Sequence, residues 1–145
     1  MIQPFVAFAS IEDHLFDMRM LVQKNRNGLW DVTADMSRVG YKNYFVTNTA
    51  YGVQPIGKVF ENTAFSSTIV SDLRDISIRV AKTLEKHLCS LGEISVDFGI
   101  TNNGKLWIIE VNGKPEKTIF GEIGDEILDK VFLTPIEYAA YLAKT

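Results

Sequence analysis

The clearest pattern along the chain is an apolar stripe near its middle. Between residues 69 and 91, hydrophobic residues recur at steps of three and four, and charged residues occupy several of the positions between them. This is the spacing of an α-helix that has one buried face and one wet face. Ser67 or Thr68 is placed to cap its start, and Gly92 is placed to end it. The pattern therefore predicts one long amphipathic helix.

Shorter apolar segments around turn residues predict two β-hairpins. Residues 16–39 form two such segments around Asn25-Arg26-Asn27-Gly28, and residues 93–101 and 105–111 flank Asn102-Asn103-Gly104. Asn-Gly turns between strands are typical of hairpins. The apolar residues 2–9 predict a further strand at the start, and residues 40–54 predict a loop with a short strand at 45–47.

The tail predicts two helices, at residues 125–132 and 135–144. Pro135 suits the first turn of the second helix, with Thr134 as its cap. The order of elements is thus strand, hairpin, long helix, hairpin and helices. That order predicts an α+β fold, in which an antiparallel β-sheet is covered by a long helix.

Composition and charge exclude some classes of binding partner. The chain has 145 residues, 46% of them hydrophobic and 23% charged, which favours a single globular unit. The net charge is −3 and the 15 basic residues are dispersed, so we expect no nucleic-acid partner. No apolar run reaches the roughly 18 residues that cross a bilayer, so we expect no membrane partner. A single cysteine excludes an internal disulfide and fits a cytoplasmic protein.

Three oxygen-bearing side chains carry the most informative chemistry. Glu110 and Asn112 lie two residues apart in one predicted strand and so point to one face. Asp97 lies on the paired strand, at a similar distance from the Asn102–Gly104 turn, so the three can converge at one end of the hairpin. Carboxylate and amide oxygens suit Mg²⁺, which takes its remaining ligands from water and phosphates. The spacing alone leaves open that they are only the polar face of a hairpin.

These residues and their neighbours resemble the metal-binding hairpin of ATP-grasp enzymes. The resemblance rests on Val96-Asp97-Phe98-Gly99 and on Ile109-Glu110-Val111-Asn112, which is followed by Lys114-Pro115. Earlier segments match other parts of that fold in order. Residues 2–6 resemble the strand and hinge that receives adenine, residues 16–25 resemble the strand with a D-x-R motif, and Arg38 resembles the arginine of the next strand. The pattern is most similar to the spore-coat-associated YheC/YheD-like group of ATP-grasp proteins.

The resemblance implies ATP and Mg²⁺ as cofactors and assigns roles to individual residues. Asp97, Glu110 and Asn112 are assigned to the metal, and Arg19 and Arg38 to phosphate or to the reaction intermediate. The assigned nucleotide contacts are Gln3, Pro4, Phe5, Val6 and Asn48. Lys114 either reaches a phosphate or an acidic substrate, or it is an ordinary solvated loop lysine. For residues 2–6 the alternative is an ordinary sheet strand.

The implied reaction joins a carboxylate substrate to an amine or a thiol through an acyl-phosphate. Nothing before Ile2 supplies the earlier lobe of a complete ATP-grasp domain. We therefore expect residues 1–145 to be one partial domain with weak or absent turnover, and to self-associate through its uncovered cleft. The alternative is a non-catalytic domain that serves in spore-coat assembly or partner binding. The sequence leaves enzymatic activity open.

Overall fold

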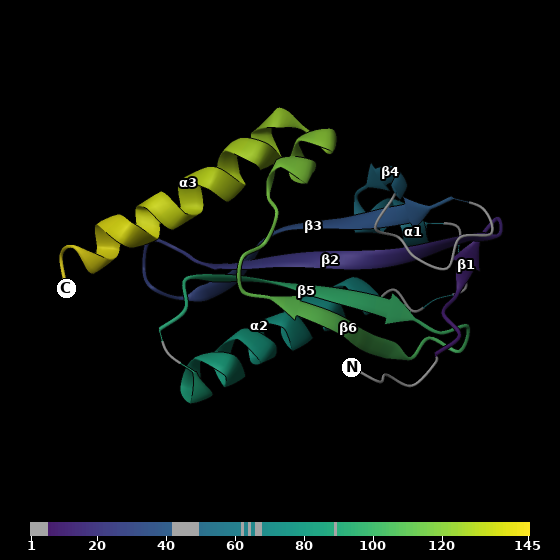
Figure 1. Cartoon of the computed structure of the whole chain (residues 1–145), viewed down its shortest axis with the longest axis horizontal. Helices are drawn as coiled ribbons and strands as arrows, with labels where there is room; N and C mark the ends of the chain where they lie inside the picture. Colours follow the sequence, from purple (N-terminus) through teal and green to yellow (C-terminus); the bar gives the residue numbers. More distant parts are fainter. Residues whose placement is uncertain (1–5, 42–49, 62, 64, 66–67, 89) are drawn as a thin grey trace.

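The computed structural model describes residues 6–41, 50–61, 63, 65, 68–88 and 90–145 (Figure 1). The chain folds as α+β, as the sequence predicted. Its elements in order are β1 (Ser10–Ile11), β2 (His14–Lys24), β3 (Trp30–Gly40), β4 (Ala50–Gln54), α1 (Ile56–Phe60), α2 (Ile69–His87), β5 (Glu93–Ile100), β6 (Leu106–Asn112), the 3-10 helix η1 (Thr118–Glu122) and α3 (Asp125–Leu142). Within the described ranges, no helix is both long and apolar enough to cross a membrane.

The strands form an antiparallel sheet in the order β4-β3-β2-β5-β6, and β1 pairs with β2. Both predicted hairpins are present, as β2–β3 and β5–β6. Gly28 and Gly104 have φ angles of 73° and 80°, which glycine adopts without strain in tight turns. Because β2 pairs with both β3 and β5, the two hairpins lie side by side in one sheet.

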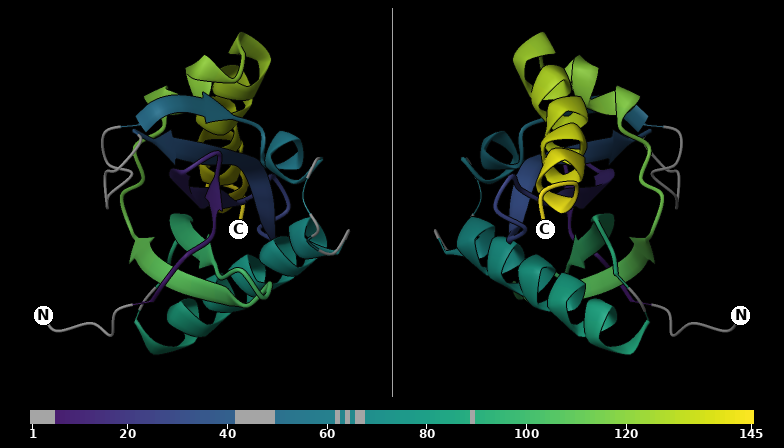
Figure 2. Two further views of the ribbon diagram at one scale, coloured as in Figure 1. Left: turned by 90° about the vertical axis from the view of Figure 1, so that its right-hand side faces the viewer. Right: turned by 90° about the vertical axis from the view of Figure 1, so that its left-hand side faces the viewer.

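Side-chain alternation gives the sheet two different faces. On one face, Met18, Met20 and Val22 of β2 belong to the same buried cluster as Leu73 and Ala81 of α2. The other face carries a smaller cluster, composed of Leu21, Ala34, Met36, Phe120 and Val131, beneath η1 and α3. Figure 2 shows α2 and α3 on opposite sides of the sheet. Period-two geometry explains why neighbouring residues of β2 serve different layers.

The long helix ends earlier than the apolar stripe indicated. α2 stops at His87, and Leu88 is 67% exposed. Leu91 still packs against the main core, from the segment that leads into β5. The stripe therefore continued past the helix because the next segment covers the same core. Thr68 stands at the N-cap position but makes no side-chain capping hydrogen bond.

The prediction of two C-terminal helices was wrong, because α3 runs unbroken through Pro135. A proline has no N–H to donate to the carbonyl four residues earlier, which here belongs to Val131. The buried Gln23 side chain supplies the missing donor: its Nε2 lies 2.9 Å from the Val131 carbonyl oxygen. A residue from the central strand thus satisfies the carbonyl that the proline leaves open.

Other segments also differ from the predictions. Residues 6–9 belong to no strand, although the Ala9 N–H donates to the Ile100 carbonyl at 2.7 Å. β4 lies within the predicted loop, and α1 falls in a segment without a clear pattern. The predicted strand at 45–47 and the first part of the predicted strand at 2–9 lie outside the described residues.

A group of hydrogen bonds at one end of the sheet connects both helical layers. The Lys24 ammonium donates to the Glu85 carboxylate of α2 and, at 3.3 Å, to the Tyr138 hydroxyl of α3. The Trp30 indole N–H also donates to Glu85, at 2.9 Å. Hydrogen bonding from Lys24 lowers the pKa of Glu85, against the effect of desolvation. Desolvation alone would lower the pKa of Lys24, but its bonds to Glu85 and Tyr138 outweigh this effect and raise it.

We predict that Gln23→Met and Pro135→Ala are energetically coupled. Gln23→Met leaves the buried Val131 carbonyl without a donor, which costs about 1–3 kcal/mol of unfolding free energy. In the Pro135→Ala background the new backbone N–H at position 135 can take over this bond, so the same change costs less, by about 1 kcal/mol. Urea unfolding of the two single variants and the double variant measures the coupling. Equal costs of Gln23→Met in both backgrounds would contradict this account.

We also predict a pH window for the Lys24–Glu85 pair. The lowered pKa of Glu85 adds stability above its ordinary value of 4.5, and this is lost as pH falls through the folded-state value. The raised pKa of Lys24 adds stability below 10.5, which is lost as pH rises through its folded-state value. Wild type should therefore exceed Glu85→Gln in unfolding free energy by about 0.5–1 kcal/mol inside this window. Denaturant titrations across pH check it; a difference unchanged in strong acid opposes it.

Candidate functional site

The candidate polar residues lie in a row across four strands, on the face that η1 and α3 cover only in part. Asp17 is opposite Arg38, Arg19 is opposite Asp97, and Asp97 is opposite Glu110. Opposed residues of antiparallel strands point to the same face of a sheet. The pairing of β3, β2, β5 and β6 therefore brings together residues that are far apart in the sequence.

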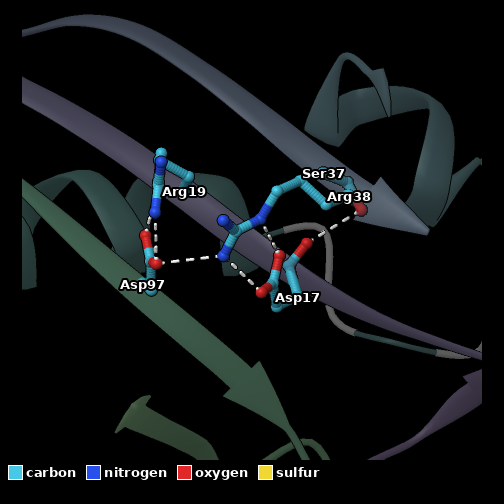
Figure 3. A network of polar contacts seen from close by, with 5 residues as sticks. All are labelled: Asp17, Arg19, Ser37, Arg38 and Asp97. Atoms are coloured by element: carbon cyan, nitrogen blue, oxygen red, sulfur yellow. Dashed lines mark hydrogen bonds and ion pairs between the residues drawn. The ribbon is translucent and has the colours of Figure 1, made fainter. Parts of the chain in front are cut away.

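Four of these side chains are linked in a network of ion pairs, in the order Arg19–Asp97–Arg38–Asp17 (Figure 3). Arg19 donates to both carboxylate oxygens of Asp97, from Nε at 2.8 Å and from Nη2 at 2.7 Å. Arg38 makes the same two-point contact with Asp17, with a distance of 2.8 Å from Nε. A further bond of 2.9 Å, from Nη2 of Arg38 to Oδ2 of Asp97, joins the two pairs. Such forked contacts fix orientation as well as distance.

The network is buried and balanced in charge. All four residues are at most 8% exposed, and two guanidinium groups face two carboxylates. Desolvation alone would lower the pKa of Arg38, but hydrogen bonds and charges from Asp17 and Asp97 outweigh it, so the pKa is raised. The resemblance assigned both arginines to phosphate or to the reaction intermediate, whereas in the structure each is held by carboxylates of the same chain.

Glu110 and Asn112 continue the row on the edge strand β6. Glu110 is exposed beside Asp97, and Asn112 is half-buried opposite Ser95. Asp97, Glu110 and Asn112 thus share one face of two neighbouring strands. A carboxylate offers about four acceptor positions, and the arginines use three of those on Asp97. Asp97 therefore has little capacity left for a metal ion, whereas Glu110 has no cationic partner in the part of the chain that the structure describes.

The segment between β6 and η1 crosses the same face, and it carries Lys114 and Glu116 (Figure 1). Lys114 is exposed. The pKa of Glu116 is lowered, first by hydrogen bonds from the Thr118 hydroxyl and backbone N–H, and also by the charge of Arg19. Lys117 fastens the segment to the sheet through Glu93, with 3.0 Å from Nζ to each carboxylate oxygen. No pattern in the sequence assigned Glu116 or Lys117 to this face.

The assigned nucleotide contacts fall mostly on residues that the structure does not describe. Gln3, Pro4, Phe5 and Asn48 lie outside the described residues. Val6 lines an open pocket of about 530 Å³ with the β5–β6 turn and Trp107. The segment that follows it packs on the candidate face, because the Phe8 ring lies over Gly99, two residues beyond Asp97. A Cβ atom at position 99 would lie 2.4 Å from that ring, so glycine permits this contact.

A metal ion requires several ligating side chains that lie close together. Among the described residues, no group of three or more His, Cys, Asp or Glu side chains is placed to hold a metal ion. A Mg²⁺ ion on this face would instead use few protein oxygens and take the rest from phosphate and water, which is its usual manner of binding. The roles assigned to Asp97, Glu110 and Asn112 stay predictions.

The sequence of the chain matches a family model and known proteins. The model of the YheC/D-like ATP-grasp domain matches residues 1–142. Two endospore coat-associated proteins of Bacillus subtilis (strain 168) are similar to the chain: YheD is 30% identical over 148 aligned residues, and YheC is 24% identical over 146. These alignments cover 99% and 98% of this chain. The chain spans only 33% of the length of YheD and 40% of that of YheC.

A solved structure agrees at the level of the fold. The crystal structure of N5-carboxyaminoimidazole ribonucleotide synthetase from Thermotoga maritima superimposes with a TM-score of 0.53 and 13% sequence identity. The superposition covers 92% of this chain and 30% of the synthetase. At this identity the likeness concerns the fold alone. The family match extends over nearly the whole chain, and we conclude that the chain belongs to the YheC/D-like ATP-grasp family.

Proposed function

We propose that this chain is the ATP- and Mg²⁺-binding part of a ligase-like protein, which joins a carboxylate to an amine or a thiol through an acyl-phosphate. Membership of the ATP-grasp family supports a nucleotide ligand. The observation that carries the proposal is the position of Glu110. It lies exposed beside a buried network in which two arginines face two aspartates, and it adds a further negative charge to this face. A divalent cation would neutralise that charge.

The residues of this face fit a hard cation. Glu110 and Asn112 offer a carboxylate and an amide oxygen from one strand, and Asp97 retains one acceptor position beside them. The Ser95 hydroxyl, opposite Asn112, is buried and has no partner among the described residues. In this proposal Glu110 and Asn112 bind Mg²⁺ and Asp97 supports them. When bound, the ion would supply charge neutralisation on the nucleotide phosphates.

The arginines would then bind phosphate with the donors that the carboxylates leave unused. A guanidinium has five N–H groups, and Arg19 uses two of them on Asp97. Asp17 and Asp97 hold the guanidinium planes in place, so little ordering remains to be done when an anion binds. Lys114 projects from the exposed segment that follows β6 and would add a mobile positive charge. Gln3 to Val6 and Asn48 would contact the rest of the nucleotide.

A second candidate function is assembly into, or binding to, the spore coat. It is favoured by the relatives YheD and YheC, which are both endospore coat-associated proteins. The two proposals differ in what they require of Glu110. Nucleotide binding depends on this carboxylate, whereas a coat scaffold that does not bind nucleotide has no need of it. Variants at this position therefore separate the two functions.

We predict that Glu110→Gln weakens the binding of a manganese–nucleotide complex at least about tenfold, because a direct ligand should matter at least as much as an outer-shell partner. Mn²⁺ replaces Mg²⁺ here because the spectrum of the free ion can be followed by electron paramagnetic resonance during a titration with ATP. Glu126→Gln is the matched control, since it removes an exposed carboxylate that lies on α3 and not on a strand of the row. Equal binding by both variants, or no binding by wild type, would refute the proposal.

We predict a different outcome for Asp97→Asn, which should lower the unfolding free energy by about 3–5 kcal/mol. The substitution leaves Arg19 buried without its carboxylate and removes one of the two partners of Arg38. Glu110→Gln should change the same quantity by less than about 0.5 kcal/mol, because Glu110 is exposed. Urea unfolding of both variants measures the contrast. Similar small losses for the two would show that the network contributes little to stability.

A further inference from the structure

The helix α3 has a well-defined inner face. Val131 lies in the cluster beneath α3, Tyr138 bonds Lys24, and the Tyr141 ring lies against Gly28. The Thr134 side chain is also buried. Positions 131, 134, 138 and 141 follow one another at helical steps of three and four, so they form one stripe toward the sheet. This stripe accounts for how α3 is attached to the rest of the chain.

The opposite side of α3 is also apolar, although no described element covers it. Phe132, Leu133 and Ile136 are 43%, 53% and 65% exposed. With the exposed alanines they form a second stripe, here called the outer stripe, which is composed of Phe132, Leu133, Ile136, Ala139, Ala140 and Ala143. Figure 1 shows α3 and η1 as the outermost layer on this side of the sheet. A helix that is apolar on both sides is normally covered on both.

We propose that the outer stripe binds a second copy of this chain, in an antiparallel helix pair with its two-fold axis at Ile136. In such a pair the same patch serves both partners, and residues equally distant from the axis face each other. Phe132 then meets Ala140, and Leu133 meets Ala139. The bulky half of the stripe in one copy therefore packs on the small half in the other, which lets the two helices approach closely.

The charges at the ends of the stripe favour the same arrangement. Asp129 lies before the bulky half and Lys144 lies after the small half, and both are exposed. In the antiparallel pair the Asp129 of each copy comes close to the Lys144 of the other. A parallel pair would instead place Asp129 near Asp129 and Phe132 against Phe132. Opposed charges and the pairing of large with small residues thus both select the antiparallel second copy.

One helix pair is a small interface, so we expect a weak dimer that depends on concentration. Sedimentation velocity of the 145-residue chain over a range of concentrations should show a reversible monomer–dimer equilibrium. Ile136→Glu places two like charges at the axis and should weaken the association at least about tenfold, since like charges in apposition cost several kcal/mol. Leu88→Glu is the matched control, because Leu88 is 67% exposed and lies outside α3.

Cross-linking tests the position of the axis. In a Cys89→Ser background, Ile136→Cys should form an intermolecular disulfide on mild oxidation, because position 136 faces its own copy. Ala140→Cys lies on the same stripe but should not cross-link, since the two copies of position 140 are about 12 Å apart along the pair. Leu29→Cys, in the β2–β3 turn, controls for random collision.

The outcomes decide between this dimer and other covers for α3. Association that Ile136→Glu weakens and Leu88→Glu leaves unchanged, together with cross-linking only at position 136, supports the proposal. A monomer at every concentration overturns it. A dimer that persists in Ile136→Glu also overturns it, because the contact would then lie on another surface. Circular dichroism confirms that each variant is folded.

Discussion

The candidate face depends on one interaction, the capture of the Asp97 carboxylate by two guanidinium groups. Arg19 and Arg38 come from the two strands of one hairpin and Asp97 comes from the next hairpin, so the contacts hold three strands in register. Removing two opposite charges from water is costly unless their hydrogen bonds are made, and here the forked contacts make them. The network holds these side chains in fixed orientations, which the proposed binding of an anionic ligand would require.

The same network limits what each residue can do. Because most of the acceptor capacity of Asp97 is used, the side chains that remain open to a cation are those of Glu110 and Asn112 on the edge strand. In the proposed function, stability and cation binding are thus divided between neighbouring residues of one row. The buried members hold the sheet together, and the exposed member carries the uncompensated charge. This division explains how a face with several buried ionisable groups can be held rigidly and still present an exposed carboxylate.

The outer layer, formed by η1 and α3, is joined to the sheet by a side-chain hydrogen bond that replaces a missing backbone bond. Pro135 interrupts the hydrogen bonding of α3, and Gln23 of the central strand restores it at the Val131 carbonyl. The Gln23 amide also donates to Glu93, which receives Lys117 from the segment before η1. One buried amide therefore links the sheet, α3 and the segment that crosses the candidate face. These bonds act together with the packing of the inner face of α3 to fix its position.

The sequence by itself determined the elements whose signals are local. The hairpins followed from Asn-Gly turns, the long helix from its apolar stripe, and the α+β class from their order. The pairing of Asp17 with Arg38 could also have been approached from the distance of each residue to the β2–β3 turn. A register shift between Leu21 and Val22 moves that pairing by one residue, and no local sequence pattern predicts this shift.

Only the tertiary structure decided the features that depend on distant partners. Pro135 led to the prediction of a helix break. The break does not occur, because a donor from a strand more than 100 residues earlier bonds the open carbonyl. It suggested a metal role for Asp97, but not the arginines that occupy this carboxylate, because those contacts arise from the pairing of β2 with β5. Periodicity describes which face a residue takes, whereas the neighbours on that face are set by how the strands and helices pack.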